Sequence, residues 1–249
     1  MTIQIEICLN GIDSAVAAQE GGATRVELCD NLIEGGTTPS QGMIDLVAEM
    51  LDIDTMVMIR PRGGDFLYTE REFEAMRRNV TFMHQHKVMG VVFGMLNPDG
   101  RVDKRRTAEL IDLARPFQVT FHRAFDMARD PLEALDDLLE LGVDRILTSG
   151  QALTAMDGLE MIALLQKQAG EDLIIMPAVG VNARNARYII QTANVREIHV
   201  GSDVESPKSS VMSFQNEAVS MGDDTELPEY AMPYTSVELV REVVAATRE

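Results

Sequence analysis

Short apolar runs with β-type composition alternate with longer stretches of helical periodicity from one end of the chain to the other. Strands and helices that alternate in this way predict a parallel sheet with helices outside it. The predicted strands are Ile3–Cys8, Arg25–Cys29, Thr55–Arg60, Gly90–Met95, Gln118–His122, Arg145–Thr148, Leu173–Ala178 and Glu197–Val200.

The helical stretches carry their own start and stop signals. Asp130 before Pro131 is typical of an N-cap followed by proline at the first helical position, and Asn182 is a second candidate cap. Gly142 and Gly170 follow apolar residues as glycine helix stops do. The predicted helices are Ser14–Gln19, Gln41–Leu51, Glu70–His86, Asp103–Ala114, Pro131–Leu141, Leu153–Gln168, Ala183–Thr192 and Ser236–Arg248.

Eight predicted strands in 249 residues indicate a single-domain (β/α)8 TIM barrel. An open doubly wound sheet is the alternative, because eight strands do not by themselves require closure. Residues 201–235 interrupt the alternation with Ser209-Ser210, Asp223-Asp224, Pro228 and Pro233. We interpret 201–235 as a loop-rich segment, before a terminal helix over 236–248, that covers one barrel end or mediates subunit contact.

Composition narrows the classes of partner. The net charge of −18 argues against nucleic acid and anionic membrane, because phosphate repels an acidic surface. The start lacks the basic and apolar regions of a secretory signal, and no apolar run approaches the ~18 residues that span a bilayer. A cytoplasmic location is therefore expected, where Cys8 and Cys29, the only cysteines, stay reduced and form no structural disulfide.

Those two cysteines lie in two similar words, Glu6-Ile7-Cys8 and Glu27-Leu28-Cys29. Side chains alternate across a strand, so each glutamate points the same way as its cysteine. If the two strands are neighbours, two thiols and two carboxylates converge on one patch. The patch could be a soft-metal site, a catalytic site or a charged plug in a barrel.

The same alternation predicts which polar side chains face the barrel interior. Apolar residues at the intervening positions should face the outer helices. Sites in this fold form at the carboxyl ends of the strands. One mouth then collects, besides the two thiols, Glu6, Glu27, Arg60, His122 and His199.

Two chemical interpretations of this mouth remain open. An enzyme would use Glu27, His122 and His199 as acid, base or orienting groups. Arginines beside glycines suit a small anionic or phosphorylated metabolite, and short glycine turns after strands seven and eight suit phosphate. The candidate anion-binding residues are Glu6, Arg60, Arg62, Asp65, Arg123, Ser149, Gly180, Gly201 and Ser202.

The other interpretation is a metal. Two thiolates on neighbouring strands suit Cu(I), which prefers sulfur ligands. Structural roles compete with both interpretations, because arginines can simply neutralise buried glutamates, and a cysteine is most often a small buried apolar residue. No dinucleotide or P-loop motif occurs, so no nucleotide cofactor is expected.

Several longer words together resemble the CutC copper-homeostasis family. The resemblance runs from the first strand to beyond the eighth. The matching words are Gly22–Cys29, Glu34–Ser40, Ile59–Phe66, Val119–Asp126 and Leu147–Gly150.

This resemblance implies a cytoplasmic TIM barrel that binds or traffics Cu(I). In animal members of the family, two cysteines at the ends of the first two strands are proposed as Cu(I) ligands. Cys8 and Cys29 fall on those positions with the same Glu-x-Cys context. TIM barrels commonly form homo-oligomers, so self-association is expected as well.

Overall fold

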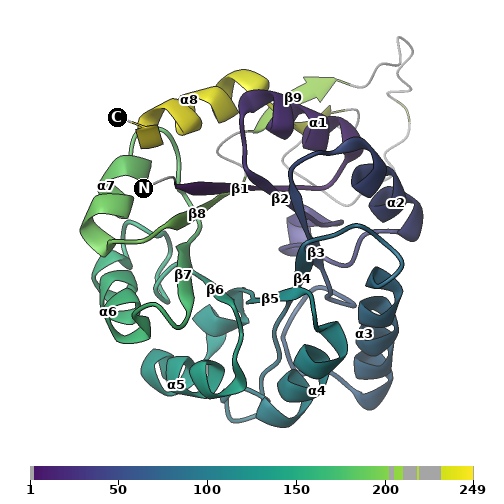
Figure 1. Ribbon diagram of the computed structural model, residues 1–249, viewed down its shortest axis with the longest axis vertical. Helices are drawn as coiled ribbons and strands as arrows, with labels where there is room; N and C mark the ends of the chain where they lie inside the picture. The colour runs from purple at the N-terminus through teal and green to yellow at the C-terminus, as the bar shows by residue number, and fades with distance from the viewer. Residues whose placement is uncertain (1–2, 202–204, 210–217, 219–230, 249) are drawn as a thin grey trace.

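Eight parallel strands form a ring around the centre of the molecule (Figure 1). The computed structural model describes residues 3–201, 205–209, 218 and 231–248. Hydrogen-bonded neighbours follow the order β7-β6-β5-β4-β3-β2-β1-β8, and β7 contacts β8 to complete the ring. The strands are β1 Gln4–Leu9, β2 Arg25–Leu28, β3 Asp54–Met58, β4 Gly90–Phe93, β5 Gln118–Phe121, β6 Arg145–Thr148, β7 Ile174–Pro177 and β8 Glu197–Val200. The predicted TIM barrel is confirmed.

Helices surround this ring on its outside (Figure 1). The last helix, α8, packs between α7 and α1, so the end of the chain closes the outer layer beside its beginning. The helices are α1 Ile12–Gly21, α2 Gln41–Met50, α3 Glu70–Met83, α4 Lys104–Ala114, α5 Pro131–Leu141, α6 Leu159–Ala169, α7 Ala186–Ala193 and α8 Val237–Arg248, with short 3-10 turns at η1 Leu32–Glu34 and η2 Arg123–Met127.

The main hydrophobic core lies between the strands and the helices. Ile5 and Ile7 of β1 and Val26 and Leu28 of β2 are buried in this layer. The alternate residues of both strands therefore face the barrel interior, as the sequence pattern predicts. This alternation brings charged and sulfur-bearing side chains to the barrel axis.

Most helix ends follow the local signals. Asp130 Oδ1 accepts hydrogen bonds from the backbone N–H groups of Leu132 and Glu133, and Pro131 begins α5. Gly142 ends α5 with φ 72°, a left-handed conformation that glycine adopts readily. The local hydrogen-bonding chemistry of these residues was thus sufficient to place α5.

Two helix starts were wrong. The predicted helix from Leu153 begins only at Leu159, because Thr154 and Asp157 bond to each other in a turn and Ala155 N–H donates to Val179 O. Asn182 is not the N-cap of α7, which begins at Ala186 after Asn185. In both places the chain makes contacts beside β7 before its helix can start.

The segment 201–235 contains two short strands. β9 (Glu205–Ser209) pairs antiparallel with β10 (Ala231–Thr235), which leads into α8. Thr235 N–H donates to Ser14 Oγ, so the end of this ribbon is fastened to α1. Most of the segment between the two strands lies outside the described residues.

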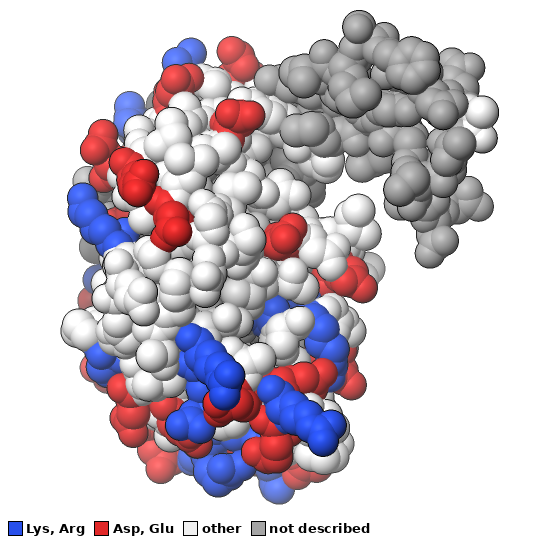
Figure 2. Space-filling model, turned by 90° about the vertical axis from the view of Figure 1, so that its right-hand side faces the viewer, with Lys and Arg blue, Asp and Glu red and all other residues white. Residues whose placement is uncertain are grey.

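Charged side chains of both signs intermingle on one face of the molecule. Figure 2 shows basic and acidic groups side by side over its lower part. On α3, Arg77 pairs with Glu74 and with Glu109 of α4, and Arg78 also pairs with Glu74. These two arginines of α3 are therefore neutralised by near neighbours. No helix among the described residues is long and apolar enough to cross a membrane.

Candidate metal-binding site

The first two strands are staggered, and this stagger sets the composition of the site. In the parallel ladder, Glu6 lies beside Arg25 and Cys8 lies beside Glu27. On its other side, Glu6 lies beside His199 of β8. Staggered strands are inherent to a closed barrel. The two Glu-x-Cys words are therefore neighbours that are offset by two residues rather than level with each other.

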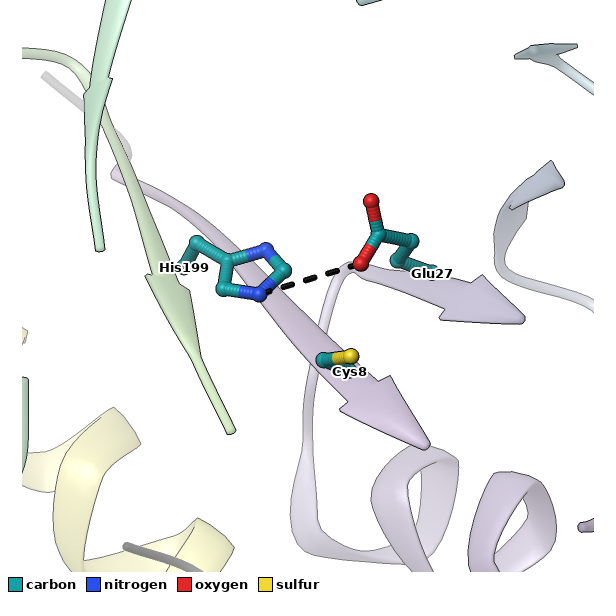
Figure 3. Close-up of side chains that lie close together, drawn as sticks. All are labelled: Cys8, Glu27 and His199. Carbon is teal, nitrogen blue, oxygen red and sulfur yellow. Dashed lines mark ion pairs between the residues drawn. The ribbon is translucent and has the colours of Figure 1, made fainter. Parts of the chain in front are cut away.

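Cys8, Cys29, Glu27 and His199 gather at the carboxyl ends of β1, β2 and β8. The sulfur atoms of Cys8 and Cys29 are 3.9 Å apart, and Cys29 Sγ donates to Glu27 Oε2 at 3.6 Å. His199 Nε2 lies 3.8 Å from the same carboxylate oxygen. Figure 3 shows the imidazole and the carboxylate facing each other with Cys8 beside them. One atom each of Cys8, Glu27 and His199 lie within 4.8 Å of one another.

A network of buried ion pairs holds His199 in place from the amino-terminal side of the barrel interior. Glu6 Oε1 lies 2.8 Å from His199 Nδ1, and Glu6 Oε2 accepts from Arg25 Nε at 2.5 Å. Arg25 also bonds to Glu197, which accepts from Arg145 Nε at 2.6 Å. These groups lie inside the barrel on its amino-terminal side. The arginine that compensates Glu6 is therefore Arg25 and not Arg60.

Sequence reasoning missed this network, although it left a signal. Arg25, Arg145 and Glu197 each stand at the first position of a strand with inward parity. The prediction concentrated on the carboxyl ends of the strands, where sites form in this fold. The charged plug instead occupies the opposite end, and Glu6 connects it to the candidate site.

The buried groups change one another's pKa values. The hydrogen bond between Cys8 and Cys29 outweighs burial and, with help from His199, lowers the pKa of the Cys8 thiol to about 5. The same bond, together with burial, raises the pKa of Cys29. Burial disfavours imidazolium, but the hydrogen bond with Cys8 and the charge of Glu27 raise the pKa of His199. The cluster therefore favours a thiolate on Cys8 beside a protonated His199.

The two glutamates behave differently. Burial, reinforced by the negative charge of Cys8, raises the pKa of Glu27 well above its usual value. Burial acts the same way on Glu6, but Arg25, His199 and Arg145 together outweigh it and lower the pKa of Glu6 to about 2. Glu27 Oε1 is buried without a hydrogen-bond partner among the described residues. One carboxylate is thus fixed in an ion-pair network, while the other retains unused bonding capacity.

Sulfur atoms also line the barrel interior next to the thiols. Cys29 packs with Met56, Met58 and Val92, and Cys8 contacts the edge of this cluster. The added Cβ of a side chain at Gly36 would lie 3.1 Å from Cys29 Sγ and 3.6 Å from Met58 Cε. The two methionines on β3 therefore provide thioethers near the thiol pair.

Arg60 and His122 form a second group at the mouth. Arg60 donates to the carbonyl oxygens of Glu34, Gly36 and Gly64, and it makes no ion pair with any described residue. Its Nε, the Nε2 of His122 and the hydroxyl of Tyr68 are buried without partners within the described chain. Burial, with Arg60 nearby, lowers the pKa of His122 to about 3. Burial also raises the pKa of Tyr68 to about 12, against the opposing effect of Arg60.

The ring of Phe66 contacts both Arg60 and His122 of this second group. Its ring centroid is 4.9 Å from that of His122 and 5.1 Å from the guanidinium carbon of Arg60. His122 Nδ1 accepts from Ala124 N–H, so a neutral ring carries its proton on Nε2. The sequence placed Arg60 and His122 at the mouth but missed Tyr68, which is remote from any strand end.

Arg62 and Asp65 are used within their own loop. Arg62 donates to Glu72 at 2.6 Å and to Asp65 at 3.0 Å, and it also bonds to Leu67 O. The side chain of Asp65 is 70% exposed. The structure therefore separates this pair from Arg60, and Arg62 braces the loop against α3.

Asp126 organises the loop after β6. Its carboxylate accepts from Thr148 Oγ1 at 2.5 Å and from the backbone and hydroxyl of Ser149 at 3.1 Å. Arg123 pairs with the same carboxylate at 2.7 Å. The predicted anion-binding residues Arg123 and Ser149 are thus brought together, with Asp126 as their common partner.

The loop after β7 has an unusual backbone. Val179 has φ 76° and Gly180 has φ 70°. A β-branched residue in the left-handed region is strained, and such strain often accompanies functional loops. Gly180 O accepts from the side-chain amides of Asn182 and Asn185. Gly201 follows β8, whereas Ser202 lies outside the described residues.

The fold and the donor group together define a TIM barrel that presents thiols, an imidazole and a carboxylate at its strand ends. Comparison with known proteins then shows to which family of TIM barrels the chain belongs. A model of the CutC family matches residues 3–204. The chain is 43% identical over 244 residues to a human protein named copper homeostasis protein cutC homolog, covering 98% of this chain and 89% of that one.

Bacterial relatives agree. A family protein CutC of Parabacteroides distasonis is 47% identical over 238 residues, covering 95% of this chain and 97% of the relative. A crystal structure of CutC from Streptococcus agalactiae is 32% identical, with a TM-score of 0.77, and it covers 80% of this chain and 98% of that one. The chain belongs to the CutC family.

Proposed function

We propose that the protein binds Cu(I) as its cargo through Cys8 and Cys29 and acts in copper homeostasis by buffering or trafficking the ion. The observation that carries this proposal is the 3.9 Å separation of the two sulfur atoms. The hydrogen-bond network around them favours a thiolate on Cys8, and thiolate is the form of cysteine that binds metal. Two soft ligands on neighbouring strands match the preference of Cu(I) for sulfur.

The surroundings of the thiols support the same proposal. Met56 and Met58 contribute polarizable thioethers beside Cys29, within an interior that is buried from water. Cys8 is partly exposed, whereas Cys29 is buried. We propose that copper enters past Cys8 and is held against Cys29. The relatives' name, copper homeostasis protein, is consistent with this role.

Competition for Cu(I) against a colorimetric chelator, under anaerobic conditions, tests the proposal. The wild-type chain should withdraw one Cu(I) per chain from the chelator. The double variant Cys8→Ser Cys29→Ser should withdraw none. Met76→Leu, which removes a buried thioether from the outer layer, is the matched control and should bind as the wild type does. Unchanged copper stoichiometry in the double variant would refute the proposal.

A second function is favoured by Arg60, which makes no ion pair with any described residue. A buried guanidinium without an ion-pair partner is costly unless an anion compensates it. With neutral His122 and Tyr68 beside it, the group offers one positive charge and three unused hydrogen-bond donors. We propose a small monoanion, such as the carboxylate of a metabolite, as the ligand of this group. Glu27, His122 or His199 would then serve an enzyme as acid or base.

Tyr68→Phe separates binding from folding. The hydroxyl has no partner within the described chain, so its removal should leave the melting temperature equal or higher. The variant should nevertheless lose thermal stabilisation by carboxylates that stabilise the wild type. If no carboxylate or phosphosugar stabilises the wild type, and Arg60→Ala changes nothing, the second function is refuted. Cytoplasmic location and homo-oligomerisation stay predictions, and light scattering tests the latter.

A further inference from the structure

The thiol pair lies beside two donors that Cu(I) does not require. Glu27 and His199 come from β2 and β8, which flank β1 on either side. His199 Nε2 and Cys29 Sγ both approach Glu27 Oε2, at 3.8 Å and 3.6 Å. Cys8, Glu27 and His199 each place a donor atom within 4.8 Å of the others, and Cys29 adjoins this group at Cys8 and at Glu27. A site built only for a soft monovalent ion has no use for the nitrogen and the oxygen.

The separations between donors can be compared with those of a coordination shell. Tetrahedral zinc with Zn–S bonds of about 2.3 Å requires about 3.8 Å between two sulfurs. With Zn–O and Zn–N bonds of about 2.1 Å, the sulfur–oxygen and nitrogen–oxygen edges become about 3.6 Å and 3.4 Å. The observed separations are 3.9 Å for Cys8 to Cys29, 3.6 Å for Cys29 to Glu27 and 3.8 Å for His199 to Glu27.

The same comparison argues against a linear arrangement. Two sulfurs on opposite sides of one ion would be separated by twice the bond length, about 4.6 Å for a 2.3 Å bond. The observed 3.9 Å is shorter by more than half an ångström. The sulfur–sulfur distance is therefore closer to the tetrahedral edge of about 3.8 Å than to the span of a linear pair.

His199 is held as a metal-bound histidine is held. Metal-ligating histidines almost always donate their other ring N–H to a carboxylate or carbonyl. Here Nδ1 lies 2.8 Å from Glu6 Oε1, and a carboxylate bonded to Arg25 can only accept. Glu6 thus fixes the ring so that Nε2 faces Glu27 and Cys8. The buried, unpartnered Glu27 Oε1 shows that this carboxylate has bonding capacity left.

We propose that Cys8, Cys29, Glu27 and His199 form a tetrahedral site for a divalent ion of borderline softness, with Zn²⁺ as the ion of closest fit. The inference deepens the proposed function, because it uses the same thiol pair, but it does not require copper to be the natural cargo. Cu(I) would engage the two sulfurs, whereas Zn²⁺ engages all four donors. Glu6 is then a positioning residue for His199.

Titration with Co²⁺ tests the geometry directly. The reduced full-length protein, kept anaerobic with a non-thiol reductant, should bind one Co²⁺ with intense visible bands of tetrahedral cobalt and a near-ultraviolet sulfur-to-cobalt charge-transfer band. Addition of Zn²⁺ should abolish both and yield its affinity. Weak octahedral bands without charge transfer would overturn the proposal.

Variants distinguish the four donors from the two sulfurs. Glu27→Gln and His199→Ala should each weaken Zn²⁺ binding at least about 100-fold, and Glu6→Gln about 10–100-fold. Copper withdrawal from the chelator should survive in all three. His84→Ala is the matched control, because the ring of this exposed histidine contacts Leu113 O and Phe117 and none of the four proposed donors. Wild-type Zn²⁺ affinity in both Glu27→Gln and His199→Ala would overturn the four-donor site.

The two proposals fail separately. Copper binding that needs both cysteines, combined with zinc binding insensitive to Glu27 and His199, would leave the copper function standing and refute the four-donor site. Tetrahedral cobalt binding without any withdrawal of Cu(I) from the chelator would leave the four-donor site standing and refute the copper function. Circular dichroism and thermal melts of each variant exclude unfolding, and Glu27→Gln, which keeps the side-chain volume, decides the matter if His199→Ala unfolds.

Discussion

Removal of the charge of Glu197 should destabilise the barrel more than any surface change of similar size. The interior network contains two cations, Arg25 and Arg145, and two anions, Glu6 and Glu197. Arg145 reaches Glu197 twice, at 2.6 Å and 3.2 Å. In Glu197→Gln one positive charge loses its compensation, and an amide N–H₂ group is forced to face guanidinium donors.

The magnitude follows from the burial of the network. Breaking a buried ion pair by removing one partner costs about 3–5 kcal/mol. Glu197 borders a pocket of about 400 Å³ at the amino-terminal end of the barrel, so water can screen part of the unpaired charge. We therefore expect about 3 kcal/mol. For a domain of this size, about 1 kcal/mol shifts the melting temperature by 2–4 °C, which gives a decrease of about 6–12 °C.

Thermal melts followed by circular dichroism measure the effect, with urea titration to give the free energy of unfolding. Glu133→Gln is the control, because its pairs with Arg101 and Arg129 lie at the surface, and the melting temperature should not change. Adding Arg145→Met to Glu197→Gln restores a neutral interior and should recover much of the loss. A melting temperature within about 2 °C of the wild type in Glu197→Gln would refute the reasoning.

Three further predictions concern single residues. His122→Asn should make the stability of the protein less sensitive to acid. The unfolded chain binds a proton at His122 near pH 6.5, whereas the folded chain, in which the pKa of His122 is about 3, does not, so His122 costs about 1.4 kcal/mol of stability per pH unit as the pH falls from 6.5 toward 3. Parallel urea stability curves for variant and wild type between pH 7 and 5 would contradict this. Gly90→Ala should destabilise the protein by about 1–3 kcal/mol or more, because the added Cβ would lie 2.2 Å from Gln118 O. Gly42→Ala, which adds a Cβ in open space on a helix, should instead stabilise the protein by up to about 1 kcal/mol. Chemical denaturation compares the two variants, and equal effects would count against the packing argument. Asp126→Asn should lower the free energy of unfolding by about 1–3 kcal/mol, because buried N–H donors in the loop after β6 lose their carboxylate acceptor. Native-state hydrogen exchange measures the opening of that loop, and exchange unchanged from the wild type would exclude this role.

The fold was predictable because its signals are local. Apolar periodicity, a proline-containing N-cap and glycine helix stops each depend on a few neighbouring residues, so strand and helix positions could be read along the chain. The start of α6 failed because its cause is not local. Ala155 N–H donates to Val179 O, 24 positions away along the chain, and this tertiary contact holds the preceding residues in a turn. The local propensities of residues 153–158 do not predict this contact with Val179.

The inward position of the polar side chains was predictable, but their pairing was not. Parity placed Glu6, Glu27, His122 and His199 inside the barrel, and all four are buried there. Parity gives the face of a strand, but it does not give the height of one strand relative to the next. Height depends on the stagger of the closed barrel, which is a property of all eight strands together. The partner of Glu6 therefore could not be chosen between Arg25 and Arg60 from the sequence.

The stagger also explains why the glutamates of the two similar Glu-x-Cys words have different partners. Because β2 is offset by two residues, Cys8 is level with Glu27, and Glu6 is level with Arg25. Glu6 is thereby drawn into the ion-pair network and can act on the site only through His199. Glu27 reaches the level of the thiols, and its Oε1 has no hydrogen-bond partner among the described residues. A neutral Glu6→Gln should therefore lower both stability and zinc affinity, whereas Glu27→Gln should lower zinc affinity alone, and equal melting temperatures for these two variants would contradict the division of roles.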